Sequence, residues 1–147
     1  MSVDFAHLLN VKADDIKELP VLPQGQYLAR IGQYEYKDAK TKNGDKPVLE
    51  FPLQLTSRVS GEGDLPPKLP EMKHTFWLTK EDGTQDEYTL NPLKVFLEAA
   101  GVTTEGRSIL EAVAEVAGNM LTVNIVHNPN KNNPARPYAN IKGFAAA

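Results

Sequence analysis

A strand pattern broken by a glycine limits the folds open to this chain; it lies in the segment GQYLARIGQYEYK, from Gly25 to Lys37. Tyr27, Ala29 and Ile31 recur at every second position, which is the pattern of a strand with one buried face. Gly32 then interrupts the pattern. A glycine inside a strand marks a bulge, a bend or a close backbone approach. We therefore predict a first strand that bends at Gly32.

Two aromatic rings and a base follow this glycine: Tyr34, Tyr36 and Lys37. Rings that stack on bases, beside cations that contact phosphates, are typical of a surface for single-stranded nucleic acid. The same tyrosines also suit a protein core. A bulge at Gly32 would exchange the faces that they occupy, so the sequence leaves open whether Tyr34 and Tyr36 point outward.

The composition indicates one domain. A chain of 147 residues can bury its own core. It has no cysteine, which excludes disulfides and cysteine-ligated zinc and is compatible with a reducing cytosol. There is no N-terminal signal pattern and no run of roughly 20 apolar residues. We therefore expect a cytoplasmic protein that does not enter a membrane.

Motifs of catalysis are absent from the sequence. It contains no phosphate-binding loop, no GxSxG, no HExxH and no cysteine nucleophile. Carboxylates are numerous, but they cluster in predicted loops and helix faces rather than on adjacent core strands, where a two-metal nuclease would need them. We expect no enzyme activity, no cofactor and no metal.

The charges are unevenly distributed. The net charge of −3 argues against a globally basic nucleic-acid binder. However, residues 26–58 hold six bases and four acids, and residues 119–147 hold three bases and no acid. Residues 59–118 hold five bases and eleven acids. We predict a surface divided by charge.

A lysine-rich hairpin is expected after the first strand. The segment KDAKTKNGDK, Lys37–Lys46, contains Asn43-Gly44, a strong turn signal between two strand-like runs. We predict that this segment is a hairpin loop. Its lysines, Lys40 and Lys42 among them, either follow phosphates or are simply solvated.

The second and third strands are predicted from alternation. PVLEFPLQLTSR places four large apolar residues on one face: Leu49, Phe51, Leu53 and Leu55. Pro52 cannot donate to a ladder, so we expect this strand at an edge or with a bulge. MKHTFWLT places Phe76 in the core and Trp77 on the outward face beside Lys73. Trp77 is then either a stacking platform or covered by the N-terminal arm or a helix.

A short strand at Asp86–Leu90 and two helices are predicted next. Asn91 is expected to cap the first helix, and Gly101 to end it. The second helix has an apolar stripe and ends at Gly118. The members of that stripe are Ile109, Leu110, Val113, Ala114 and Val116.

Two strands close the chain, with a basic loop between them. One contains Leu121 and Ile125, and the other begins at Tyr138. The loop His127–Pro137 carries Lys131 and Arg136 and no acid, and we expect a mobile flap that closes on a nucleic acid. Tyr138 would stack on a base if its face is outward.

The predicted order is three strands, helices and two strands. This is the connectivity of an OB-fold, a mostly β, five-stranded antiparallel Greek-key barrel, here with its helices between strands three and four. The alternative is another small antiparallel barrel or a sheet with helices on one side. We expect an N-terminal arm at 1–24, an OB-fold domain at 25–144 and a frayed tail at 145–147.

Four segments of the chain carry a resemblance to a known family: PQGQYLARI, the hairpin YEYKDAKTKNGDKPVLEFPLQL, GNMLTVNIV and YANIKGF. Through them the chain resembles a family of bacteriophage single-stranded DNA-binding proteins with an OB-fold. The resemblance spans most of the chain through strand patterns and turn residues. It implies binding of single-stranded DNA without strong sequence preference, and protection of that DNA during phage replication or recombination in the host cytoplasm. The terminus GFAAA lacks the acidic tip by which bacterial single-strand binders recruit partners. With the loop residues above, the candidate DNA-binding set is Arg30, Tyr34, Tyr36, Lys37, Lys40, Lys42, Lys73, Trp77, Lys131, Arg136 and Tyr138.

The alternative function is an OB-like protein-interaction module, for instance a phage structural or accessory protein. Trp77 and the tyrosines would then anchor a protein interface. The partners to consider are single-stranded DNA, phage or host replication and recombination proteins, and a second copy in a homodimer. The sequence leaves the oligomeric state, the site size and the choice between DNA and RNA open.

Overall fold

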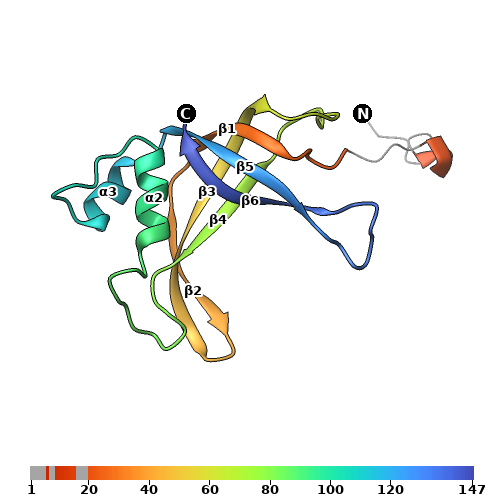
Figure 1. Ribbon diagram of the computed structural model, residues 1–147. Helices are drawn as coiled ribbons and strands as arrows, with labels where there is room; N and C mark the ends of the chain where they lie inside the picture. Colours follow the sequence, from red (N-terminus) through yellow and green to blue (C-terminus); the bar gives the residue numbers. More distant parts are fainter. Residues whose placement is uncertain (1–5, 7–8, 16–19) are drawn as a thin grey trace.

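The computed structural model describes residues 6, 9–15 and 20–147. Its described part forms one antiparallel sheet of six strands, with two α-helices between the fourth and fifth strands. A mostly β chain with two helices at this place is therefore confirmed. Figure 1 shows both helices at one end of the sheet and two hairpins, β2–β3 and β5–β6, projecting from it. The elements are η1 (Ala13–Asp15), β1 (Gly25–Ile31), β2 (Glu35–Thr41), β3 (Gly44–Ser60), β4 (Glu71–Trp77), α2 (Asn91–Ala99), α3 (Ile109–Glu115), β5 (Met120–Asn128) and β6 (Tyr138–Ala146).

The sheet is open rather than closed by hydrogen bonds. Hydrogen-bonded neighbours follow the order β2-β3-β1-β5-β6, in which β2 and β1 pair with successive stretches of the same side of β3. Strand β4 pairs with the opposite side of β3. Among the described residues, β4 and β6 meet only through side chains. The Phe144 ring lies 5.1 Å from the His74 ring and 6.2 Å from the Phe76 ring, between centroids.

The predicted bend at Gly32 is confirmed, and it turns one predicted strand into two. β1 pairs with β3 from Leu53 onward, whereas β2 pairs with β3 up to Glu50, so both run along the same side of β3. Between them the Gly32 N–H donates to the Pro52 carbonyl at 2.8 Å. A Cβ atom at Gly32 would lie 2.7 Å from Pro52 Cγ, so only glycine allows this approach.

Gly32→Ala is expected to lower the free energy of unfolding by about 1–3 kcal/mol, because the added methyl group forces apart two strands that already touch. Urea unfolding measures the loss. Gly143→Ala is the matched control, since a Cβ there meets nothing within 4 Å. Equal free energies for the two variants would contradict the close contact at Gly32.

Of the two alternatives predicted for the strand at Pro52, an edge position or a bulge, the edge position is wrong, and the pairing with β4 passes Pro52 without a register shift. β3 is flanked on both sides, by β1 and β2 on one and by β4 on the other. The Pro52 carbonyl accepts the hydrogen bond from Gly32. In a strand, the nitrogen and the carbonyl of one residue point to the same side, so the proline nitrogen also faces the break between β1 and β2. No ladder donor is needed at that point, and the proline is tolerated in a central strand.

The core lies between the inward face of the sheet and the helices. All four apolar residues predicted to share a face of β3 are buried, as are Tyr27, Ala29 and Ile31 of β1. Phe51 is fully buried at the centre of a ring cluster. Its centroid lies 4.9 Å from Phe96 of α2, 5.8 Å from Phe76 and 6.0 Å from Tyr34.

Two local predictions before α2 are wrong. Residues 86–90 form turns rather than a strand, because the Asp86 carboxylate accepts hydrogen bonds from the Tyr88 N–H and the Thr89 hydroxyl. Asn91 is the first residue of α2 rather than its cap; Leu90 precedes the helix and makes no side-chain capping bond.

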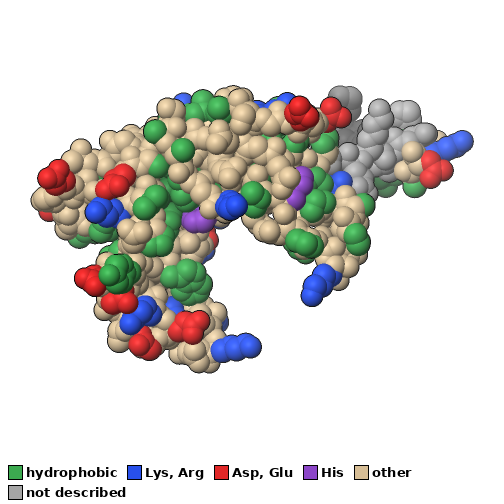
Figure 2. All heavy atoms as spheres, in the orientation of Figure 1, with side chains coloured by type: hydrophobic (Ala, Val, Ile, Leu, Met, Phe, Trp, Pro, Cys, Tyr) green, Lys and Arg blue, Asp and Glu red, His purple; other side chains and the backbone are tan. Residues whose placement is uncertain are grey.

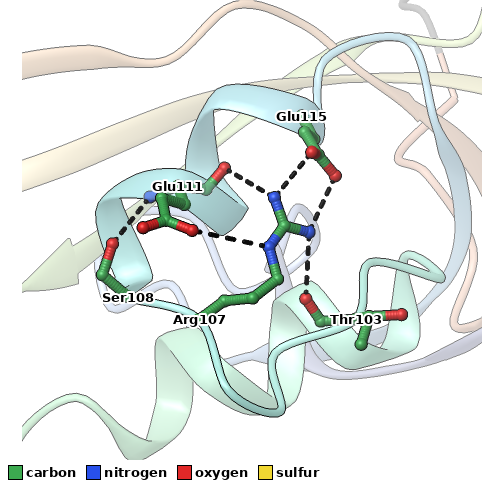
Figure 3. Close-up of polar contacts among 5 residues, drawn as sticks. All are labelled: Thr103, Arg107, Ser108, Glu111 and Glu115. Carbon is green, nitrogen blue, oxygen red and sulfur yellow. Dashed lines mark hydrogen bonds and ion pairs between the residues drawn. The ribbon is translucent and has the colours of Figure 1, made fainter.

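Helix α3 is held by an arginine that sequence patterns did not single out. The Arg107 guanidinium bonds both carboxylate oxygens of Glu115, at 2.8 and 2.6 Å, and the Thr103 carbonyl at 3.2 Å (Figure 3). This contact lowers the pKa of Glu115 below its usual value. Ser108 caps the helix by accepting from the Glu111 N–H. Leu110, predicted to join the apolar stripe, is instead 75% exposed.

The N-terminal arm ends in contact with the sheet, and most of the C-terminal tail belongs to it. Tyr27 donates a 2.7 Å hydrogen bond to the Pro23 carbonyl, and Leu22 and Pro23 are buried, so the end of the arm packs on the sheet. Arm residues 1–5, 7–8 and 16–19 lie outside the described part. The expected frayed tail is wrong for Ala145 and Ala146, which pair with β5 as part of β6.

Candidate nucleic-acid interface

Trp77 lies on the outward face of the sheet, as predicted. It pairs with Val48 of β3, which in turn pairs with Lys37 of β2. Residues directly opposite one another share a face, so one row carries the lysine, the valine and the tryptophan. The Trp77 side chain is 49% exposed. About half of the side chain is therefore open to solvent, although the start of α2, at Pro92, lines a hollow together with it.

A carboxylate shares this face, and sequence analysis did not assign it a role. Glu50 Oε1 lies 3.0 Å from Lys37 Nζ and 3.9 Å from Lys73 Nζ, and Thr75 donates to its other oxygen at 3.4 Å. The hydrogen bond from Lys37 lowers the pKa of Glu50. Two candidate phosphate-binding lysines therefore share one negative charge, which weakens the attraction of the sheet face for an anion.

Arg30 extends the outward face onto β1. It is exposed and pairs with Gln54, which pairs with Glu71 of β4. Arg30 therefore lies on the same face as Lys73 but beside the gap between β1 and β2. The structure thus brings Arg30, Lys37, Lys73 and Trp77 together on one face.

Tyr34 and Tyr36 do not belong to this face. Tyr36 pairs with Leu49, which pairs with Phe76, and both of those residues are in the core. Tyr34 packs against Phe51. Grouping the two tyrosines with Trp77 is therefore wrong, because the break after Gly32 places them on the side that the helices occupy.

The predicted lysine-rich loop is mostly strand. β2 continues to Thr41, β3 begins at Gly44, and the turn consists of Lys42 and Asn43. The Thr41 hydroxyl fixes the turn by donating to the Gly44 carbonyl at 2.6 Å. Lys40 and Lys42 are both exposed on this hairpin. The strands thus carry the lysines outward from the sheet as one rigid arm.

The β5–β6 hairpin forms the second arm. Lys131 is exposed at its end, Arg136 is partly exposed, and Tyr138 is 53% exposed. The loop has its own hydrogen bonds: the Asn130 side chain accepts from the Asn132 and Asn133 N–H groups and donates to the Arg136 carbonyl. Its predicted closure on nucleic acid stays a prediction.

Between the two arms the surface is hollowed. Figure 2 shows this space with blue lysine and arginine side chains at the end of each arm. Another hollow, of about 630 Å³, lies beside Trp77 and against the β2–β3 turn. Lys46 and Thr79 line it, and neither was among the predicted site residues. For Lys46 the sequence signal was the general prediction that the lysines of Lys37–Lys46 either follow phosphates or are solvated; Thr79 had no such signal.

His74 lies in the opening between β4 and β6. Its ring contacts the Phe76 and Phe144 rings, with centroids 4.7 and 5.1 Å away, and burial lowers its pKa. It pairs with Phe51 on the inward face. Within the described residues no group of three or more His, Cys, Asp or Glu side chains is placed to hold a metal ion.

Acidic pH is expected to destabilise the protein through His74. The unfolded side chain takes up a proton at about pH 6.5, whereas the folded one takes it up only at lower pH, so the free energy of unfolding falls as pH falls. The stabilisation is complete above about pH 6.5 and is lost as pH passes through the folded pKa. Urea unfolding at about pH 7.5 and 5.5 should show a larger loss for the wild type than for His74→Leu. Equal losses would exclude His74 as the cause.

One family model matches residues 9–147, nearly the whole chain. The chain belongs to this family. Its description is "Protein of unknown function (DUF669)". No curated protein matches the sequence. In the described part, no helix is both long and apolar enough to cross a membrane.

Proposed function

We propose that this member of DUF669 binds single-stranded DNA in the hollow between the β2–β3 and β5–β6 arms. One observation carries the proposal. The half-exposed Trp77 lies on the outward face of the sheet beside the β2–β3 arm, a second hairpin projects from the same sheet (Figure 1), and each hairpin ends in an exposed lysine. An aromatic platform inside a positively charged groove is the general solution for a single strand, because every base offers a face for stacking.

We further propose that the sheet is an OB-type barrel left open between β4 and β6. Taken as one bent strand, β1 and β2 lie between β3 and β5, and the helices connect β4 to β5. OB-folds bind oligonucleotides on the face of their second and third strands and at the loops after the first and fourth strands. Here those places are β3, β4 and the two arms. The barrel proposal thus supports the same location for DNA.

The chemistry favours single strands over duplexes and gives little choice among sequences. The candidate contacts are a ring and lysines rather than side chains arranged to read base edges. In a duplex the bases are already stacked and unavailable to Trp77. The resemblance to phage single-strand binders supports protection of DNA during phage replication or recombination as the biological role.

Both arms are expected to contact phosphates. Lys42→Ala and Lys131→Ala should each reduce the slope of log affinity against log salt by about 0.7, and the double variant by about 1.4. Fluorescence anisotropy of labelled oligo-dT measures these slopes. Lys94→Ala, an exposed lysine on α2 that pairs with Glu98, is the control and should leave the slope unchanged. A loss at only one of the two arms would contradict a strand that spans the hollow.

A second candidate function is docking of a protein on the opposite face of the sheet. An apolar hollow of about 490 Å³ lies there between β2 and α3. Tyr36, 61% exposed, and Leu110 line it, and exposed apolar surface of this kind marks interaction sites. A second copy of the chain is the partner that is directly testable. Sedimentation should give a dimer for the wild type and a monomer for Leu110→Asp; a monomeric wild type would exclude this partner.

A further inference from the structure

The hollow beside Trp77 combines an aromatic ring, lysines and small polar side chains in one concave place. Its volume of about 630 Å³ falls in the range of small-molecule sites. It lies between the β2–β3 turn and the segment that follows β4. Its lining residues are Thr41, Lys42, Asn43, Lys46, Trp77, Thr79, Lys80 and Glu81.

Lys46 joins the two walls of this hollow. It lies on the outward face of β3, two positions before the valine that pairs with Trp77. A Cβ atom on Gly83 would lie 3.6 Å from Lys46 Nζ, so the ammonium group reaches the turn at residues 80–84. That turn is fixed by two backbone hydrogen bonds between Lys80 and residues 83 and 84. The ammonium group therefore lies between the β2–β3 hairpin and the turn at residues 80–84.

The lysines of the hollow differ in how they are neutralised. Lys80 pairs with Asp86 at 3.6 Å. Lys42 and Lys46 form no ion pair within the described ranges of the chain, and Glu81 is the only acid in the lining. Lys37 and Lys73, by contrast, share Glu50. The hollow is thus the part of the Trp77 face with the greatest capacity for an added anion.

Thr79 adds a polar group that lacks a partner. Its hydroxyl oxygen is buried, and it makes no hydrogen bond with any described residue. A buried polar group without a partner is destabilising. Thr79 lines both this hollow and a neighbouring one beside Pro92 of α2. A ligand that enters beside Trp77, with the Thr79 side chain turned into the hollow, would give the hydroxyl a hydrogen bond that it lacks in this structure.

We propose that this hollow binds one nucleotide. The base stacks on Trp77, the phosphate lies between Lys42 and Lys46, and the Thr79 hydroxyl hydrogen-bonds a polar group of the nucleotide. The inference rests on the proposed function and deepens it, because it assigns one nucleotide of a bound strand to an individual pocket. The same chemistry is present in a free nucleoside monophosphate, which makes the pocket testable apart from the rest of the strand.

The test uses dTMP and thymidine as probes and Trp77 emission as the signal. The expected result is quenching by both, with thymidine about 5- to 30-fold weaker because it lacks the phosphate that two lysines contact. Lys42→Ala combined with Lys46→Ala should remove this difference. Lys94→Ala is the control, since Lys94 is an exposed lysine on α2 that pairs with Glu98 and does not line the hollow. Equal affinity for dTMP and thymidine in the wild type would overturn the phosphate assignment.

Thr79→Val tests the hydroxyl by two readouts. Valine has a similar shape without the unpartnered oxygen, so the free energy of unfolding should stay equal or rise. Affinity for dTMP should nevertheless fall by about 2- to 10-fold, and Thr79→Ser should retain it. A variant with unchanged dTMP affinity would overturn the role of Thr79.

Comparison with oligo-dT separates this inference from the proposed function. Salt-dependent binding of oligo-dT without any binding of dTMP would overturn the pocket and leave the proposed function standing. Binding of dTMP with no tighter binding of oligo-dT would support the pocket and overturn single-stranded DNA as the ligand. Binding of both, with oligo-dT tighter, supports both.

Discussion

Phe51→Ala is expected to lower the free energy of unfolding by about 3–5 kcal/mol, the usual loss when a buried phenylalanine is truncated. Phe51 is fully buried and contacts the rings of Tyr34, Phe76 and Phe96. These rings belong to the segment after Gly32, to β4 and to α2. The cavity would therefore separate three parts of the fold, and the surrounding rings could not fill it without moving their backbones.

Urea unfolding followed by circular dichroism measures this loss. Tyr138→Ala is the control, because an exposed position usually changes stability by no more than about 0.5 kcal/mol. If Phe51→Ala cost less than the typical value of about 1 kcal/mol for an average mutation, the ring cluster would not be the centre of the core.

Trp77→Ala is expected to weaken binding of single-stranded DNA by about 1–3 kcal/mol, the effect of removing one stacking ring. Stability should change little, since the side chain is half exposed and lies at the end of β4. The salt dependence should also stay the same, because no cation is removed. Competition against labelled oligo-dT gives both the affinity and the slope.

Tyr36→Ala is the matched control for Trp77→Ala. It removes an aromatic ring of similar exposure from the opposite face of the sheet, and it should leave DNA affinity unchanged. If Tyr36→Ala weakened binding as much as Trp77→Ala, the strand would also contact the helix side, and binding would not be confined to the Trp77 face. A role for Tyr36 in DNA binding would then not depend on which face of the sheet it occupies, the point that the sequence left open.

Sequence alternation predicted most of the sheet because alternation is a local property. Leu49, Phe51 and Leu53 share a buried face whichever strands lie beside them. The bend at Gly32 was also predictable, because a glycine inside a strand marks a bulge, a bend or a close approach; that Pro52 is the approaching residue is known only from the structure. What alternation could not give is the number of strands. The bend divides one predicted strand into β1 and β2, and both pair with β3.

The site was predicted less completely than the fold because it depends on register between strands. The outward position of Trp77 follows from its own strand. The pairing of Glu50 with Lys37 and Lys73 follows only from the alignment of β2, β3 and β4. The face of Tyr36 depends on the length of the break after Gly32. Asp86 turned a predicted strand into turns through side-chain bonds that no periodicity indicates.

The most direct test of single-stranded DNA binding is a titration with oligo-dT of about 20 nucleotides, followed by tryptophan emission at several salt concentrations. Trp77 is the only tryptophan in the chain, so the signal reports on the proposed site alone. The expected result is quenching on binding, with log affinity falling against log salt at a slope of about −2 to −3, the value for three or four phosphate contacts. Unchanged emission together with a slope near zero would contradict the proposal.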